Sequence, residues 1–414
     1  MKGKNMKKIE LLAPAGDPEK LKIAVDYGAD AVYFGGAGFS LRAGAGNFTV
    51  EEMLEGVRYA HEHGCAVYMT INIFAHNEDI RQLPEFLESI REVEIDAFLV
   101  SDPGVMRLLL RHRPGAVIHL STQANTTNYE TALFWYDLGV RRIVAAREMS
   151  LEELREFRRS LPEEMEIEVF VHGAMCISYS GRCLLSNFMT GRDANRGACA
   201  HPCRWSYSLV EEKRPGEYFP VEEDARGTYF FNSKDLCMVE YLPDLIEAGV
   251  ASAKIEGRMK SIFYLATVLR VYRTAIDSYY ADPEHYRFRK EWLEELSKAS
   301  HRHFTTGFFF ERPDQESQNY DSSAYIREYE FIGIVREYDP ETGTALVEQR
   351  NNFRVGDSIE VFGPGSAGFF PMTVESMINE EGESIQVAPH AQQLVTMPVK
   401  HPVRPGYMLR WARK

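Results

Sequence analysis

The stretch IELLAPAGDPEKLKIAVDYGADAVYFGG, residues 9–36, contains one complete strand–helix–strand unit. Two short apolar runs, residues 9–16 and 30–36, enclose a helical segment that ends at Gly28, and glycine favours the left-handed conformation that closes a helix. A strand, a helix and a second strand in this order predict parallel strands joined by a right-handed crossover. The stretch therefore indicates an α/β fold.

The same unit repeats as far as about residue 260. The further strand-like runs are AVYMTIN (66–72), DAFLVSD (96–102), VIHLSTQ (117–123), RRIVAARE (141–148), EIEVFVHG (166–173) and ASAKIEGR (251–258). Helical stretches such as residues 49–64 and 150–162 lie between them and carry the 3.6-residue apolar period. Eight such units predict a TIM-type (β/α)8 barrel over residues 1–302, with a doubly wound open sheet as the alternative.

The pattern changes near residue 326, where short strands alternate with turns. The strands are EFIGIVREY, GTALVEQR, DSIEVFG, MTVESM and SIQVAP, and the turns between them include DPETG and GPGSAG. A chain of 414 residues exceeds the usual limit for one hydrophobic core. We therefore expect a small all-β barrel domain at 326–414, joined to the first domain by a linker at 303–325.

Residues 174–250 are too long for an ordinary strand–helix loop and are predicted to be a cysteine-rich insertion after the seventh strand. They hold five of the six cysteines, namely Cys176, Cys183, Cys199, Cys203 and Cys237. Such a density indicates either disulfides or a metal site. The basic start of the chain is not followed by a secretory apolar core, so we expect a cytoplasmic protein with reduced thiols, which favours metal.

The spacing of the first four cysteines helps to distinguish a zinc site from an iron–sulfur cluster. Structural zinc ribbons use two C-x₂-C pairs, which this segment lacks. An irregular set of four thiolates at the mouth of a barrel favours a 4Fe-4S cluster, with zinc as the alternative. Cys237, in NSKDLCMVEYLPDL, is expected in the first turn of a helix, and it and Cys65 are interpreted as packing thiols.

Alternation along the strands places several polar side chains inside the predicted barrel. Glu168 and His172 share one face of the seventh strand, and Lys254 and Glu256 share one face of the eighth. Buried charges need partners, so a structural network of Lys and Glu is one interpretation. Substrate contact is the other, and the strand-end residues that fit it are Gln123, His172, Glu256 and Arg258.

Charge and motifs limit the function classes. The formal net charge of −14 argues against a chain that binds nucleic acid over its whole surface. Arg182, Arg192, Arg196 and Arg204 form a local basic set, which is interpreted either as a basic path or as side chains that are solvated or paired with nearby acids. Apolar runs stay far below the roughly twenty residues that span a bilayer, so we expect no membrane association. The sequence lacks H-E-x-x-H and G-x-S-x-G, which leaves a papain-like use of one cysteine with His172 as the protease alternative.

The segment EVFVHGAMCISYSGRCLLS, residues 168–186, resembles the signature of the peptidase U32 family, the collagenase-like proteases. Further blocks are similar to that family in the same order, namely LLAPAG, GADAVYFGG, LRAGAGNF, STQANTTN, GACAHPCRW, NSKDL and KIEGRMKS. The resemblance extends over essentially the whole chain and includes the C-terminal domain, which resembles domain 2 of translation factors.

This resemblance implies a function. The family name comes from a reported collagenase activity. Other members are oxygen-independent hydroxylation factors that act on the tRNA wobble uridine, on 23S rRNA or on quinone precursors. The chain most resembles the tRNA branch, which supports prephenate-dependent formation of 5-hydroxyuridine. The resemblance implies tRNA and a small-molecule co-substrate as partners, with a paralogous protein as a further candidate partner.

The resemblance also implies site residues. Carried over by motif, the 4Fe-4S ligands are Cys176, Cys183, Cys199 and Cys203. Some relatives draw one ligand from elsewhere in the chain, so Cys237 is the alternative to Cys203 as the fourth ligand. Lys254, Arg258 and the residues at strand ends are candidates for substrate binding. Arg42, in LRAGAGNF, is a further candidate, and no catalytic residue is assigned.

Overall fold

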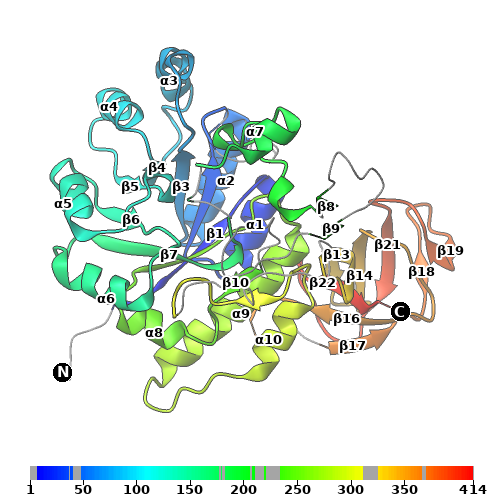
Figure 1. Ribbon diagram of the computed structural model, residues 1–414. Coiled ribbons are helices and arrows are strands. Elements are labelled where there is room, and N and C mark those ends of the chain that lie inside the picture. The colour runs from blue at the N-terminus through cyan, green and yellow to red at the C-terminus, as the bar shows by residue number, and fades with distance from the viewer. Residues whose placement is uncertain are drawn as a thin grey trace. The chain divides into compact units, whose positions relative to one another are not determined.

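Eight strands in the described part of the chain close into a parallel barrel (Figure 1). They are β1 (Glu10–Pro14), β2 (Ala31–Gly35), β3 (Ala66–Ile71), β4 (Ala97–Val100), β5 (Ile118–Leu120), β6 (Arg142–Val144), β7 (Glu166–Ala174) and β11 (Ser252–Ile255). Ser252 of β11 pairs with both Glu10 of β1 and Glu168 of β7, which closes the ring. The predicted TIM-type barrel is therefore confirmed, and the open-sheet alternative is wrong.

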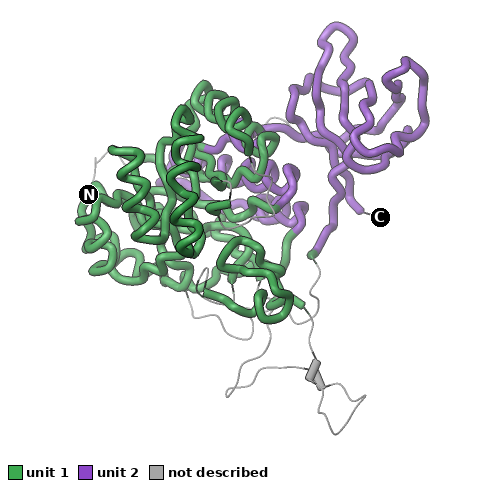
Figure 2. The backbone as a smooth tube through the Cα atoms, turned by 90° about the horizontal axis from the view of Figure 1, so that it is seen from above, with its two compact units in different colours: residues 1–22, 30–259, 301–325 green, residues 23–29, 260–300, 326–414 purple. Residues whose placement is uncertain are grey.

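The computed structural model describes residues 7–36, 38–40, 48–176, 179, 182–205, 208–209, 219–220, 234–310, 325–365 and 370–413. The chain divides into two compact units (Figure 2). The first comprises residues 1–22, 30–259 and 301–325, and the second comprises residues 23–29, 260–300 and 326–414. Among the described helices, none is long and apolar enough to cross a membrane.

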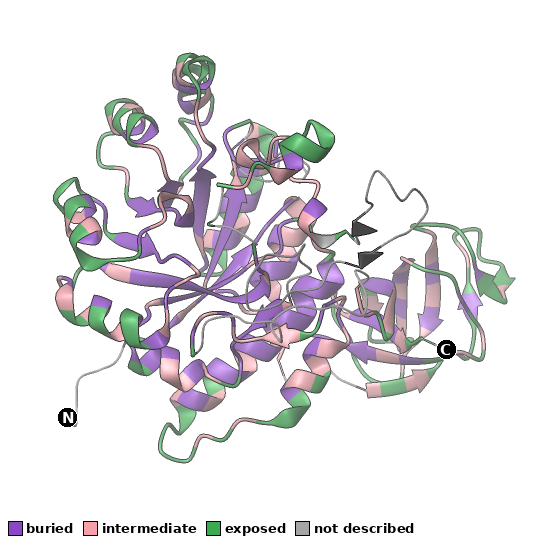
Figure 3. Cartoon of the chain, in the orientation of Figure 1, coloured by how far each residue is buried: buried purple, intermediate pink, exposed green. Residues whose placement is uncertain are grey.

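Helices connect consecutive barrel strands. They are α1 (Pro18–Asp26), α2 (Val50–Glu62), α3 (Asn77–Ser89), α4 (Pro103–His112), α5 (Tyr129–Asp137), α6 (Leu151–Ser160) and α8 (Leu242–Glu247). Thr49 and Ser150 begin α2 and α6 with capping boxes, in which the side chain accepts from the backbone N–H three residues on. Figure 3 shows that the strands are buried while the outer helix faces are exposed, which explains why the strands are nearly continuous apolar runs.

The predicted insertion lies between β7 and β11. Its elements in the described residues are α7 (Leu185–Thr190), the 3₁₀ turns η2 (Ala194–Arg196) and η3 (Pro202–Arg204), β8 (Ser208–Leu209), β9 (Phe219–Pro220) and β10 (Asp235–Cys237). β8 and β9 pair antiparallel. The mouth side of β7 is extended by β10, which pairs antiparallel with it and parallel with β12 (Phe304–Thr305).

The helix expected around Cys237 is wrong, because Cys237 ends the strand β10. β7 runs on for nine residues, whereas its barrel neighbours β6 and β11 have three and four. The last residues of β7 therefore need another backbone partner, since buried N–H and C=O groups are nearly always paired. β10 supplies it, with Cys237 opposite His172.

The second unit contains two helices after the last barrel strand and an antiparallel sheet. The helices are α9 (Ile262–Ala281) and α10 (Lys290–Ser297). The sheet, in spatial order, is β17 (Phe370–Thr373), β16 (Ser358–Phe362), β22 (Met408–Ala412), β13 (Tyr329–Asp339), β14 (Thr344–Gln349), β21 (Leu394–Pro398), β18 (Met377–Ile378) and β19 (Ser384–Ile385), with β15 (Phe353–Arg354) and β20 (Val387–Ala388) as a separate pair.

This sheet confirms a small all-β domain and forms a half-barrel over its own core. Residues such as Ile332, Val347, Phe353 and Val395 are fully buried there. Arg410 of β22 is also fully buried and donates to the Glu295 carboxylate at 2.7 and 2.9 Å. A buried guanidinium needs such a bidentate partner, so this pair ties α10 to the sheet.

Cys65 is a core thiol, as predicted, with 2% of its surface exposed. Burial, followed by the nearby Asp30 and Glu10 carboxylates, raises the pKa of this thiol to about 12. The thiolate is the reactive form, so in metal-free protein at pH 8 we expect iodoacetamide to label exposed Cys176 at least about 100-fold faster than Cys65. Peptide mass spectrometry over a time course measures both rates. Equal rates in the folded protein contradict the prediction, and equal rates in urea serve as the control.

Candidate functional site

The lower half of the barrel interior holds a buried charge network. Arg142, at the start of β6, donates to Glu10 at 2.6 Å, to Glu166 at 2.7 Å and to Glu168 at 3.3 Å. Lys254 donates to the other oxygen of Glu168 at 2.7 Å, and Glu168 has no exposed surface. The predicted network of Lys and Glu is therefore confirmed, and within it Lys254 pairs with Glu168 inside the barrel. A contact of Lys254 with substrate stays a prediction.

Electrostatics in this network follow from burial and charge. Burial alone lowers the pKa of the Arg142 guanidinium, but the attraction of Glu10 and Glu168 outweighs it and raises that pKa overall. Burial lowers the pKa of Lys254, against the opposing attraction of Glu168. Arg142 thus remains charged and holds three carboxylates together.

Two polar groups lie above this network, at the carboxyl ends of the strands, where the barrel opens. The first consists of Arg258, Ser40 and Thr70. Arg258 Nη1 donates to Ser40 Oγ and, at 3.1 Å, to Thr70 Oγ1. Only 6% of Arg258 is exposed, so its charge is held at the barrel opening by hydroxyls. The structure therefore places Arg258 at the mouth, where the sequence predicts it.

A second polar group at the mouth consists of side-chain amides. Asn72, directly after β3, donates through Nδ2 to Ser121 Oγ at 2.9 Å and to Gln123 Oε1 at 3.0 Å. Ser121 also donates to Gln123. Thr70 and Asn72 lie two residues apart at the end of β3, so this amide group and the Arg258 group are neighbours. Asn72 was missed by the sequence interpretation, although its position after the run AVYMTI is the available signal.

Asn125 follows this group and has an unusual backbone. Its φ of 55° lies in the left-handed region, which few residues other than glycine and asparagine adopt. Both its side-chain amide atoms are buried and have no hydrogen-bond partner among the described residues. Buried amides are normally paired, so Asn125 is a candidate for ligand contact.

The remaining predicted residues lie along the long strand β7 and its neighbours. His172 is 2% exposed, and its carbonyl accepts from the Glu256 N–H at 2.9 Å. Its ring lies 5.7 Å from that of Phe304. Asp235 of β10, which the sequence interpretation did not select, is 2% exposed and accepts from the Arg302 N–H at 3.2 Å. Arg42 lies outside the described residues.

The cysteine segment crosses the mouth. It leaves the barrel at the end of β7, yet the Asn195 carbonyl accepts from the Phe74 N–H at 3.2 Å, just after β3. Arg196 donates to both oxygens of Asp79, the third residue of α3, at 2.7 and 2.8 Å. β3 is four strands from β7 in either direction around the ring, so these contacts lie on the opposite side of the barrel. Asn195 and Arg196 therefore lie on the side of the mouth opposite the end of β7.

All six cysteines are free thiols. Two of them are buried, and the other four are exposed or partly buried. Cys65 and Cys237 are buried, Cys176 is exposed, and Cys183, Cys199 and Cys203 are intermediate. The Ala200 N–H donates to Ser186 Oγ at 2.9 Å, which links the chain beside Cys199 to the helix that follows Cys183. The donor chemistry of the four less buried thiols fits an iron–sulfur cluster or zinc. Within the described residues, no three His, Cys, Asp or Glu side chains are arranged to hold a metal ion.

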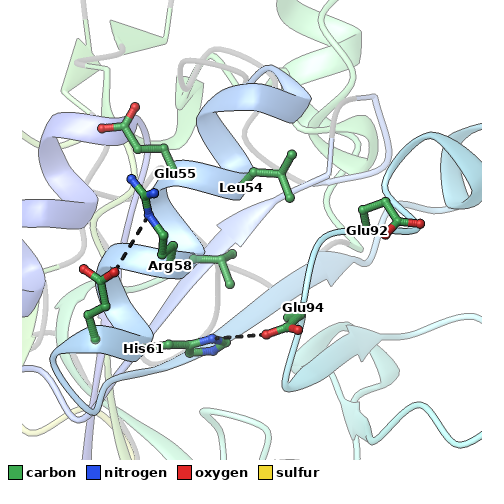
Figure 4. A pocket seen from close by; sticks show the side chains of 8 residues that line it. Leu54, Glu55, Arg58, His61, Glu92 and Glu94 are labelled. Atoms are coloured by element: carbon green, nitrogen blue, oxygen red, sulfur yellow. Dashed lines mark ion pairs between the residues drawn. The ribbon is translucent and has the colours of Figure 1, made fainter.

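A pocket of about 570 Å³ lies outside the barrel, between α2 and the loop before β4 (Figure 4). Its lining includes Leu54 and Arg58, but carboxylates predominate, namely Glu55, Glu62, Glu92 and Glu94. Figure 4 shows His61 turned toward Glu94. An acidic lining repels polyanions, and none of the predicted site residues lies here, so we place the functional site at the barrel mouth instead.

Comparison with known proteins gives full-length matches. The chain is 45% identical to tRNA hydroxylation protein P1 of Bacillus subtilis (strain 168), over 98% of this chain and 95% of that protein. It is 38% identical to tRNA hydroxylation protein P of Escherichia coli (strain K12), over 98% and 96%. It is 32% identical to a protein named collagenase of Porphyromonas gingivalis (strain ATCC BAA-308 / W83), over 97% of both chains.

Two family models match consecutive parts of the sequence. Residues 16–319 match peptidase family U32, and residues 327–410 match the peptidase family U32 C-terminal domain. Together they span the barrel from the end of β1, the cysteine segment and nearly all of the C-terminal sheet. The chain therefore belongs to peptidase family U32.

Proposed function

We propose that this protein is a tRNA-modifying enzyme that hydroxylates the wobble uridine at C5. The observation that carries the proposal is the similarity, over nearly the whole chain, to two proteins named for tRNA hydroxylation. The polar mouth of the barrel supports it, because active sites of this fold lie at the carboxyl ends of the strands. A uridine flipped out of its loop can enter such an opening.

The amide group supplies chemistry suited to a uracil ring. Uracil presents one N–H donor and two carbonyl acceptors, and the side-chain amides of Asn72, Gln123 and Asn125 offer both donors and acceptors. Asn72 and Gln123 already orient one another, so their remaining donors are held in place before substrate arrives. We assign base recognition to these residues.

We propose a 4Fe-4S cluster as the cofactor, held by Cys176, Cys183, Cys199 and Cys203, with zinc as the alternative. Cys176 is exposed and the other three thiols are partly buried, whereas Cys237 is 6% exposed within β10. That burial supports Cys203 over Cys237 as the fourth ligand. A bound cluster would supply electron transfer or activation of the oxygen donor.

Prephenate is proposed as a required metabolite, and a small-molecule co-substrate enters the same opening. Prephenate carries two carboxylates, and the mouth holds arginines that can pair with them. Arg258 is one, and Arg147 is another, held over the Phe170 ring at 3.9 Å and donating to the Ala174 carbonyl at 2.8 Å. Guanidinium groups bind carboxylates in a bidentate manner, which fits this role.

A deletion strain tests the proposed function. We expect 5-hydroxyuridine to disappear from its tRNA and to return when the gene is restored, as measured by nucleoside mass spectrometry. Restoration with Gln123→Leu is expected to reduce the modification about 10- to 100-fold, because a partly buried hydrogen-bonding group of the site is lost. Gln82→Leu, on the exposed face of α3, is the matched control. Unchanged modification in the deletion strain contradicts the proposal.

Peptidase activity on collagen-like chains is the second candidate, favoured by the 32% identity to the protein named collagenase. Cleavage of gelatin by metal-free protein with all four mouth cysteines replaced by alanine supports a peptidase. Absence of cleavage by both wild type and variant counts against it.

A further inference from the structure

The cysteine segment exposes large apolar side chains. Phe188 is 85% exposed and Leu184 66%, and Met189 and Trp205 are each more than 40% exposed. Figure 3 shows the outer surface of α7 as exposed. A cluster of exposed apolar side chains is typical of an interaction surface.

Local structure holds this surface outward. Ser186, fully buried, faces the segment behind α7, where its Oγ accepts from the Ala200 N–H at 2.9 Å. Phe188 lies two residues on, which is the opposite side of a helix, and Leu184 precedes Phe188 by one turn. Gly191, with φ of 67°, ends the helix in the left-handed conformation. Leu184 and Phe188 are therefore fixed toward solvent by the anchoring of the opposite face. The turn η3, which Trp205 follows directly, packs against α7, so Trp205 lies close to this helix.

The same segment carries a net positive charge, whereas the whole chain is negatively charged. Residues 182–205 contain four arginines, Arg182, Arg192, Arg196 and Arg204, against a single acid, Asp193, whereas the full chain carries −14. Arg182 and Arg192 are exposed, and Arg182 also stacks over the Phe74 ring at 5.2 Å. Positive charge beside exposed aromatic rings complements single-stranded nucleic acid, in which bases stack and phosphates repel acids.

We propose that Leu184, Phe188, Met189 and Trp205 form a stacking surface for unpaired bases of the tRNA anticodon loop, flanked by Arg182 and Arg192 at the phosphates. The proposal rests on the proposed function and names the part of the substrate that this surface holds. It places neighbouring loop bases beside Cys183 and Cys203, while the target base enters the barrel below. Sequence-specific RNA recognition uses such unstacked loop bases rather than the duplex.

Binding of a labelled anticodon stem-loop, with unmodified uridine at the wobble position, tests the surface by fluorescence anisotropy. We expect Phe188→Ala to weaken binding about tenfold without changing its salt dependence, because stacking on one aromatic ring is lost. Arg192→Gln is expected to lower the slope of log K against log salt by about 0.7. Phe134→Ala is the matched control, because Phe134 is 60% exposed on α5, away from this segment. Phe188 is exposed, so its replacement leaves no cavity.

Three results overturn the proposal. One is equal affinity of Phe188→Ala and wild type for the stem-loop. Another is an equal loss of affinity for a fully paired hairpin of the same length. The third is a change in sedimentation of Phe188→Ala without RNA, which assigns the surface to a second copy of the chain. If Phe188→Ala binds the stem-loop normally and hydroxylation in cells is intact, the stacking surface is rejected while the proposed function stands. If the deletion strain keeps its 5-hydroxyuridine, the proposed function itself is rejected.

Discussion

Cys183→Ala is expected to abolish wobble-uridine hydroxylation and to remove most of the iron and sulfide from the anaerobically purified protein. A 4Fe-4S cluster uses one thiolate for each iron, so loss of one ligand leaves an iron open to solvent. Cys183 suits the test because it is only partly buried and precedes α7, whose Ser186 anchors the segment with Cys199. Absorbance, iron and sulfide counts, and nucleoside mass spectrometry measure the effect.

Two further variants sharpen this prediction. Cys203→Ala is expected to match Cys183→Ala, whereas Cys237→Ala is expected to retain iron, because Cys237 lies in the barrel extension opposite His172. Cys65→Ala is the control for removal of a buried thiol. A colourless wild-type protein that contains zinc contradicts the cluster, and iron loss in Cys237→Ala alone reassigns the fourth ligand.

Arg142→Met is expected to lower the free energy of unfolding by about 3–5 kcal/mol, because it leaves buried carboxylates without their common partner. Arg142 is 5% exposed and bonds Glu10, Glu166 and Glu168, and Glu168 is fully buried. Urea denaturation measures the change. Lys7→Met is the control, because Lys7 also pairs with Glu166 at 2.6 Å but its side chain is 82% exposed, and such pairs contribute about 0–1 kcal/mol.

The pH dependence of the Arg142 variant has a defined sign. In the native protein the attraction of Arg142, followed by that of Lys7, outweighs burial and lowers the pKa of Glu166. Without Arg142, the folded-state pKa of Glu166 rises, because burial loses the main attraction that opposes it. The variant's deficit is therefore smallest near pH 4 and grows as the pH rises toward 7. A deficit independent of pH contradicts this account.

Some features of the site follow from strand alternation alone. Glu168 and Lys254 were placed inside the barrel from their positions in two strands, and they form an ion pair at 2.7 Å. The prediction succeeds because a side chain in a strand points to one of two faces. Alternation fails at Cys237, because a short strand and the first turn of a helix have similar apolar patterns.

Other features depend on contacts between distant residues. Asn72 meets Gln123 across 51 positions, and Asn195 meets Phe74 across more than 100, so neither contact leaves a periodic pattern in the sequence. Asp235 became part of the mouth only because β10 pairs with the overhanging end of β7.

The sequence by itself determined the repeated strand–helix units, the cysteine insertion after the seventh strand, the β-rich C-terminal region and the family. These are local patterns of period, turn chemistry and motif, which each segment carries independently of its neighbours. The tertiary structure alone decided that β11 closes the ring onto β1, that the cysteine segment crosses the mouth to β3, and that the face bearing Phe188 points to solvent. Those outcomes depend on which surfaces bury one another, and burial is a property of the whole packed chain.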